Sequence, residues 1–157
     1  MPADFAGALQ AIKDKFTAEW VLGGNPRTRV AEVNKEPGAP WPPKGTDGLL
    51  ASWLLIAPEG SGVIHRGFGK PGSQQYIYYG HVRIHVYIPV GGGTEDAFLL
   101  AIAAGEIFRA KKFYDDVSPG CYVRTWAPQV DGGGPGDDDG AWFRVTATIP
   151  FDYYHRG

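Results

Sequence analysis

The four histidines are the residues of this chain best suited to acid–base or metal chemistry. His81 and His85 fall on the same face of a predicted strand, but they lie ~13 Å apart along it at ~3.3 Å per residue, which is too far for one metal ion. Arg83 stands between them and would repel a cation. The pattern predicts a solvated or interface-facing sheet surface, and we expect no bound metal.

Nucleophilic catalysis has as little support. Ser61 stands in Gly-Ser-Gly, which is not the G-x-S-x-G turn of hydrolases, and no local pattern puts a His and an Asp beside it. The single Cys121 falls in a predicted strand, where a cysteine is usually part of the core. It cannot form an internal disulfide, which is typical of proteins from a reducing compartment. We therefore predict no catalytic residue and no enzyme.

Two glycine-rich segments have the spacing of phosphate-binding loops. Residues 67–72 read G-x-G-x-x-G, but a dinucleotide site needs a helix directly afterwards, and a Tyr-rich strand is expected there. Residues 91–94 do stand between a strand and a helix, yet Glu95 and Asp96 already occupy the positive helix end and would repel an anion. We expect no nucleotide or other cofactor, and Thr94 as a helix cap.

Four aspartates gather near the C-terminus: Asp131, Asp137, Asp138 and Asp139. An EF-hand needs carboxylates at alternate positions and a distal Glu, and neither occurs. Among so many glycines the segment 131–140 is expected to be a mobile, acidic hairpin tip. It is either a solvated loop or an electrostatic surface directed at a polyanion.

Composition limits the class of protein. A chain of 157 residues is expected to form one domain, 1–157, with a single core. Its 15 basic and 17 acidic side chains nearly cancel, so no basic field attracts nucleic acid. No apolar run approaches the ~18 residues of a membrane span, and the N-terminus has the pattern of a helix rather than of a signal peptide. Abundant aromatic residues with weak net charge favour a protein–protein assembly.

Hydrophobic periodicity predicts an α+β fold. Every second residue is apolar in the strand of Val82, Ile84 and Val86, whereas three- and four-residue spacing marks two helices. We expect a mixed or antiparallel sheet of about five strands, flanked by the two helices, with a long acidic C-terminal hairpin. In chain order the expected elements are a helix (3–19), a strand (28–33), a polyproline-like segment (36–48), a strand (49–57), a glycine-rich loop (59–75), a strand (76–88), a helix (95–109), a strand (121–127), the acidic turn (131–140) and a strand (141–151).

In the order of its motifs the chain resembles the tail terminator, or tail completion, proteins of long-tailed phages and phage-like particles. The resemblance covers nearly the whole chain, from the N-terminal helix onward. It is carried by Arg29-Val30 leading to Asn34 and Trp41-Pro42-Pro43, by Ile88-Pro89 before a Gly-Thr turn, by Ile107-Phe108-Arg109 at a helix end, and by the last strand from Trp142 through Pro150-Phe151. The long acidic hairpin tip departs from the family pattern.

The resemblance implies a non-enzymatic homo-oligomer, typically a hexameric ring, which caps the finished tail tube and joins it to the head connector. Its partners would be the tail tube protein and the connector or stopper protein, and DNA would pass through the ring without specific binding. Such a protein is found in the virion, and in the host cytoplasm during assembly, with no membrane partner.

Two sets of site residues follow for such a ring. The acidic tip, Asp131 with Asp137, Asp138 and Asp139, would face the lumen or a partner. The arm of Trp41, Pro42 and Pro43 would reach a neighbouring subunit, because a polyproline-like segment loses little entropy on docking. Other readings stay open: another neck or tail component, such as a stopper or tube protein, or an unrelated soluble enzyme or ligand-binding domain.

Overall fold

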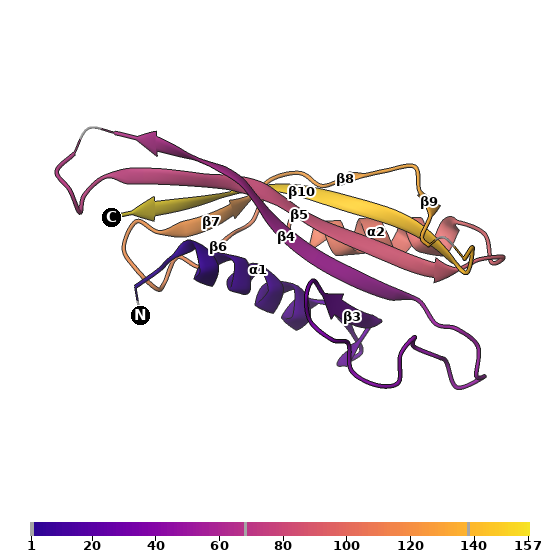
Figure 1. Ribbon diagram of the computed structural model, residues 1–157. Coiled ribbons are helices and arrows are strands. Elements are labelled where there is room, and N and C mark those ends of the chain that lie inside the picture. Colours follow the sequence, from indigo (N-terminus) through magenta and orange to yellow (C-terminus); the bar gives the residue numbers. More distant parts are fainter. Residues whose placement is uncertain (1, 68, 138) are drawn as a thin grey trace.

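The computed structural model describes residues 2–67, 69–137 and 139–157. It has a mixed α+β fold, in which two helices pack against a long, twisted sheet (Figure 1). The expected sheet of about five strands is too small, since the described residues form an eight-stranded sheet and a separate two-stranded one. The elements are α1 (Phe5–Glu19), β1 (Val21–Leu22), β2 (Asn25–Pro26), β3 (Arg29–Glu32), β4 (Trp53–Arg66), β5 (Gln75–Pro89), α2 (Glu95–Glu106), β6 (Lys112–Phe113), β7 (Tyr122–Thr125), β8 (Gln129–Val130), β9 (Gly134–Pro135) and β10 (Trp142–Arg156).

Three long antiparallel strands form the centre of the sheet, whose order is β3-β4-β5-β10-β7-β6. Ile84 of β5 lies opposite Ile56 on one side and Ala147 on the other. The alternation seen in the sequence puts Val82, Ile84 and Val86 on the helix-covered face, where all three are fully buried. The predicted inward face of this strand is therefore confirmed. Each of these side chains contributes roughly 1.5–3 kcal/mol to the stability of the fold by leaving water.

Helix α1 begins where the sequence supplies a cap. The Oδ1 atom of Asp4 accepts a hydrogen bond from the backbone N–H of Gly7 at 2.6 Å, which pairs one of the free donors of the first turn. The helix buries Ile12 and Phe16 against the sheet. The ring of Phe16 stacks on that of Phe108, with centroids 6.2 Å apart, and so joins α1 to the segment after α2.

Helix α2 lies close to the sheet because the residues that face it are small. Those residues are Ala97, Ala101 and Ala104, all fully buried. A Cβ atom on Gly105 would come within 2.8 Å of the Cβ of Pro128. Both helices therefore cover one face of the sheet. None of the described residues forms a helix on the other face, which we call the helix-free face.

The ends of α2 differ from the prediction. Thr94 does stand at the N-cap position, but its side chain makes no capping hydrogen bond. Its carbonyl accepts from the N–H of Phe98 at 3.2 Å instead. The helix ends at Glu106 and not at Arg109, because residues 107–110 form a turn.

The glycine-rich loop predicted over 59–75 is too long, since its first part belongs to a strand. Strand β4 continues to Arg66 and pairs with β5 as far as Gln75. The glycines serve close packing of backbones: a Cβ atom on Gly80 would lie 2.0 Å from the carbonyl oxygen of Glu59. A residue type that usually marks a turn is here required inside a strand.

We call the part of the sheet beyond the β-bulge between Gly60 and Gly62 the distal sheet. It lies at the end of the molecule that carries the C-terminus (Figure 1). It comprises residues 60–66 of β4, 75–80 of β5, 122–125 of β7 and 151–156 of β10.

Three short strands, β7, β8 and β9, pair one after another with the long strand β10. Their pairs with β10 include Thr125 with Phe151, Gln129 with Thr148, and Gly134 with Arg144. Strand β9 ends at Pro135 and β10 begins at Trp142, so the connection between them is shorter than the predicted 131–140. Strand β10 continues to Arg156, because β5 offers it partners as far as Gln75.

The proline-rich segment is bent rather than extended. Residues 39–42 form bends, and the peptide bonds before Pro40 and Pro42 are cis. The expected polyproline-like conformation is therefore wrong, and the strand predicted from residue 49 begins at Trp53. Among the residues that the structure describes, no helix has the length and apolar character needed to cross a membrane.

Candidate interaction surface

The histidines of β5 have structural surroundings. The Nδ1 atom of His85 lies 2.7 Å from the Oγ1 atom of Thr146 on the neighbouring strand. Burial lowers the pKa of His85, and the positive charges of Arg144 and Arg83 lower it further, which favours the neutral imidazole near pH 7. Within the described ranges no three His, Cys, Asp or Glu side chains gather as metal ligands would.

One pair of reactive side chains could not be seen in the sequence. The Sγ atom of Cys121 lies 3.9 Å from Nδ1 of His155, and the hydroxyl of Tyr153 lies 3.0 Å from the same nitrogen. A thiol beside an imidazole is the arrangement that activates cysteine nucleophiles. Here Cys121 is only 2% exposed, so a substrate has no approach to the sulfur. Cys121 is part of the core, whereas His155 is half-buried. Burial raises the pKa of Tyr153.

Trp41, Pro42 and Pro43, expected at a subunit contact, lie partly on their own subunit. The half-buried ring of Trp41 meets the ring of Trp53 edge-on, with centroids 4.8 Å apart. Pro43 is buried and Pro42 is exposed. The Arg29 guanidinium lies 5.9 Å from the centroid of the Trp41 ring. A contact of this segment with a neighbouring subunit stays a prediction.

Trp41 covers one end of an aromatic cluster on the helix-free face of the sheet. Trp53 stacks on Tyr87 with centroids 4.1 Å apart and meets Trp142 edge-on at 6.0 Å. Such pairs contribute roughly 0.5–1.5 kcal/mol each beyond the area they bury. The buried Nε1 atom of Trp53 has no hydrogen-bond partner among the residues described.

Part of the acidic tip is built into the hairpin. Oδ1 of Asp131 accepts hydrogen bonds from the N–H groups of Gly133 and Thr146, both at 3.0 Å. Oδ1 of Asp137 accepts from the N–H of Ala141 at 3.0 Å. The sequence predicted one mobile tip over 131–140, but Asp131 and Asp137 each accept hydrogen bonds from backbone N–H groups. Asp139 is exposed, and Asp138 lies outside the described residues.

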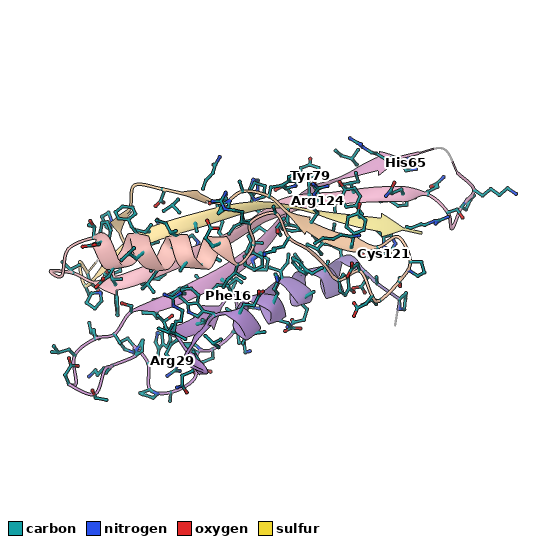
Figure 2. All side chains as sticks on the ribbon, turned by 180° about the vertical axis from the view of Figure 1, so that it is seen from behind. Phe16, Arg29, His65, Tyr79, Cys121 and Arg124 are labelled. Carbon is teal, nitrogen blue, oxygen red and sulfur yellow. The ribbon has the colours of Figure 1, made fainter. Side chains whose placement is uncertain are left out.

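An apolar groove of about 380 Å³ opens on the helix-free face of the distal sheet. Its lining includes Ile64 and two aromatic side chains, Tyr79 and Trp126, which are 47%, 39% and 39% exposed. Figure 2 shows Tyr79 together with Arg124, on the opposite side of the sheet from Phe16. We call this hollow the distal groove.

Trp126 is held rigidly at the rim of the distal groove. Its indole N–H donates to Oδ2 of Asp152 at 3.1 Å, and the Arg124 guanidinium lies 4.4 Å from its ring centroid. Arg124 and Asp152 lie opposite each other on β7 and β10. An exposed aromatic ring whose rotamer is already fixed loses little entropy when it binds a partner.

The second apolar surface is the outward side of α2. Leu99 and Ile102, three residues apart, are 57% and 50% exposed. The exposed carboxylates of Glu95, Asp96 and Glu106 stand at the two ends of this stripe. We call it the α2 stripe.

A wider hollow of about 800 Å³ lies between the proline-rich segment and α2. Arg27 and Arg29 line it, but both are engaged within the chain. The Arg27 guanidinium lies 4.9 Å from the centroid of the Trp20 ring, and Arg29 donates to the carbonyl oxygen of Gly38 at 2.5 Å. These cations support the local fold and are not aligned on a common acceptor.

Comparisons with known proteins bear on the fold. No protein-family model matches the chain, and no curated protein matches it. One solved protein structure resembles it with a TM-score of 0.59, at 19% sequence identity over 96% of both chains. At this identity the likeness shows that the α+β architecture recurs in another protein, and nothing about activity is transferred from it.

Proposed function

We propose that this protein is a structural component of a long-tailed phage or phage-like particle, where copies of it form a ring that caps the finished tail tube and joins it to the head connector. The order of motifs along the chain supports this. The Arg29-Val30 pair falls in β3, Ile88-Pro89 ends β5, and Ile107-Phe108-Arg109 directly follows α2.

The observation that carries the proposal is the distribution of apolar side chains on the surface. Leu99 and Ile102 on α2, and Tyr79 and Trp126 in the distal groove, are each at least 39% exposed. Trp and Tyr anchors are typical of protein–protein hot spots. A chain that offers two such surfaces, on different sides, fits a subunit that has a neighbour on each side.

The acidic tip would act in such a ring through its charge. In the lumen, the carboxylates of Asp131, Asp137, Asp138 and Asp139 would repel DNA phosphates and keep DNA from adhering to the wall. Against an axial partner, the same charges would attract a basic patch, and salt would weaken joining. We favour the lumen, because two of the carboxylates already accept hydrogen bonds from the hairpin's own backbone and act on other molecules mainly at a distance.

Electron microscopy of capped tubes tests the proposal. Tail tubes of the phage or particle whose genome carries this chain are prepared without a terminator and mixed with the purified protein. We expect extra density at one end of each tube, and a ring mass by native mass spectrometry. Binding along the sides of the tubes, or none at all, would contradict the proposal.

A charge-neutral variant tests the tip. Asp137, Asp138 and Asp139 are replaced by Asn, with Asn at the exposed Asp115 and Asp116 as the control. Slower DNA release with normal joining supports the lumen, whereas lost joining supports a partner contact. No change in either would reject a role for the tip.

Trp41→Ala tests the proline-rich segment. We expect weaker assembly, together with a small loss of monomer stability of about 0.5–1.5 kcal/mol from the lost contact with Trp53. Assembly equal to that of the parent would assign Trp41 to its own subunit alone.

A further inference from the structure

We propose that the distal groove of one copy receives the α2 stripe of the next copy. The inference deepens the proposed function, because it depends on the ring and names the contact that would build it. Both surfaces are apolar and exposed: Tyr79 and Trp126 in the groove, Leu99 and Ile102 on the stripe. Exposed apolar residues that lie together mark interaction sites more often than isolated ones do.

The two surfaces cannot meet within one chain. The α2 stripe is the outward side of a helix whose Ala97, Ala101 and Ala104 pack on the sheet. The distal groove opens on the helix-free face of the same sheet (Figure 2). A contact between them therefore joins two copies through different surfaces, and such a heterologous contact leads to a closed ring or an open filament rather than to a two-fold dimer.

Charge selects this pairing over a groove-to-groove or helix-to-helix contact. The helix carries Glu95, Asp96 and Glu106 and contains no Lys or Arg. Arg109 neutralises Glu106 through an ion pair at 2.8 Å, so the net negative charge of the helix comes from Glu95 and Asp96. The distal groove is lined by Arg66 and by Asp152, and Arg124 lies opposite Asp152 on the neighbouring strand, so the charge around the groove is net positive. Opposite charges around two apolar centres favour their association and disfavour self-pairing of either surface.

The dimensions also agree. The twelve residues of α2 span about 18 Å at 1.5 Å per residue. The distal part of β4, residues 60–66, spans roughly 23 Å at about 3.3 Å per residue. Within that length the groove of about 380 Å³ has room for Leu99 and Ile102 side by side.

Complementation between two variants tests the inference. Leu99→Lys with Ile102→Lys disables the stripe, and Trp126→Ala disables the groove. Leu99 and Ile102 are exposed, so the stripe variant should melt at the temperature of the parent. Trp126→Ala also removes the hydrogen bond to Asp152 and the contact with Arg124, so this variant should stay folded but melt slightly below the parent. Leu22→Lys, at a leucine 69% exposed on β1, is the matched control and should assemble normally.

Each variant alone should lose assembly, weakening association about 30-fold or more, as expected for a hot spot. Mixed together, the two should give a heterodimer and no ring, because only the groove of the stripe variant and the stripe of the groove variant remain intact. Native mass spectrometry of the parent, of each variant and of the mixture reads this directly.

Three results would overturn the inference: a parent that stays monomeric, variants that assemble like the parent, or a mixture without heterodimer. Failure of the inference is separable from failure of the proposed function. A parent ring that both variants still form removes this contact and leaves the function standing. A ring built through this contact that ignores tail tubes removes the function and leaves the contact standing.

Discussion

The hydrogen bonds of Asp131 lead to a quantitative prediction for the acidic tip. Its Oδ1 atom accepts from the N–H groups of Gly133 and Thr146 at 3.0 Å. The N–H of Asp131 in turn donates to the carbonyl of Thr146 at 3.1 Å. Since Thr146 is only 8% exposed, water cannot easily replace the lost acceptor. Asp131→Ala should therefore lower the free energy of unfolding, because it leaves the N–H group of a buried residue without its partner.

The magnitude follows from the hydrogen bond to Thr146. A donor left unpaired in a buried site costs about 1–3 kcal/mol, whereas the exposed N–H of Gly133 can turn to water. We expect Asp131→Ala to cost about 1–3 kcal/mol in the free energy of unfolding. Asp131→Asn keeps an oxygen at the same place, so it should cost less than about 1 kcal/mol although it removes the same charge.

Urea unfolding at neutral pH measures the difference. With an m value of about 2 kcal/mol per molar, the alanine variant should lower the midpoint by about 0.5–1.5 M at unchanged m. Asp139→Ala, at an exposed position between β9 and β10, is the control and should stay within about 0.5 kcal/mol of the parent. The argument fails if Asn at position 131 costs as much as Ala, or if Ala at 131 and at 139 behave alike.

Three further substitutions probe the sheet. Val86→Asp puts a carboxylate on the fully buried face and should unfold the domain; a parent-like melt would refute the face assignment. Burial and neighbouring arginines lower the pKa of His85 in the folded state. The unfolded state therefore takes up a proton first as the pH drops, and the free energy of unfolding falls below pH about 6.5. Urea titrations at pH about 7.5 and 5.5 should show a smaller fall for His85→Asn than for the parent. Gly80→Ala, whose Cβ would lie 2.0 Å from the carbonyl oxygen of Glu59, should cost about 1–3 kcal/mol or more, whereas Ala at Gly92 meets nothing within 4 Å.

Hydrophobic periodicity was sufficient for the elements whose pattern is uninterrupted. The alternation around Val86 and the stripe containing Phe16 predicted a strand and a helix, and both residues are buried as expected. The reason is that burying one apolar face drives the folding of each of these elements, and the spacing of apolar residues in the sequence shows which face that is. Ends of elements were less predictable: β10 passes Pro150 and continues to Arg156, because its neighbour β5 supplies pairing partners there.

Glycine misled the prediction of the distal sheet. Gly60 and Gly62 make the segment 59–75 resemble a loop. In the structure they allow a bulge and a close approach of two backbones, which no single-chain pattern distinguishes from a turn. The exposed Val63 and Ile64 between the glycines were the available sign of a strand.

The surface residues show the same limit. Arg124 and Trp126, two residues apart, can be assigned to one strand face from the sequence alone. Their third partner, Asp152, joins them only because β7 and β10 are in register. The bond from Asp131 to Gly133 was open to prediction, since Asp side chains often accept from the backbone two residues on. The bond to Thr146 was not, because it depends on long-range pairing.

The helix-free face of the sheet carries aromatic rings at both ends, and the chain treats the two ends differently. At one end the proline-rich segment folds back, and Trp41 closes over Trp53 at 4.8 Å. At the other end Trp126 is fixed upright by Arg124 and Asp152 yet stays 39% exposed beside Tyr79. Fixing a large ring costs side-chain entropy, and the exposed part of the ring recovers none of it through burial. A covering group supplied from outside the chain would recover it, and the apolar α2 stripe of another copy has the size and the charge for that role.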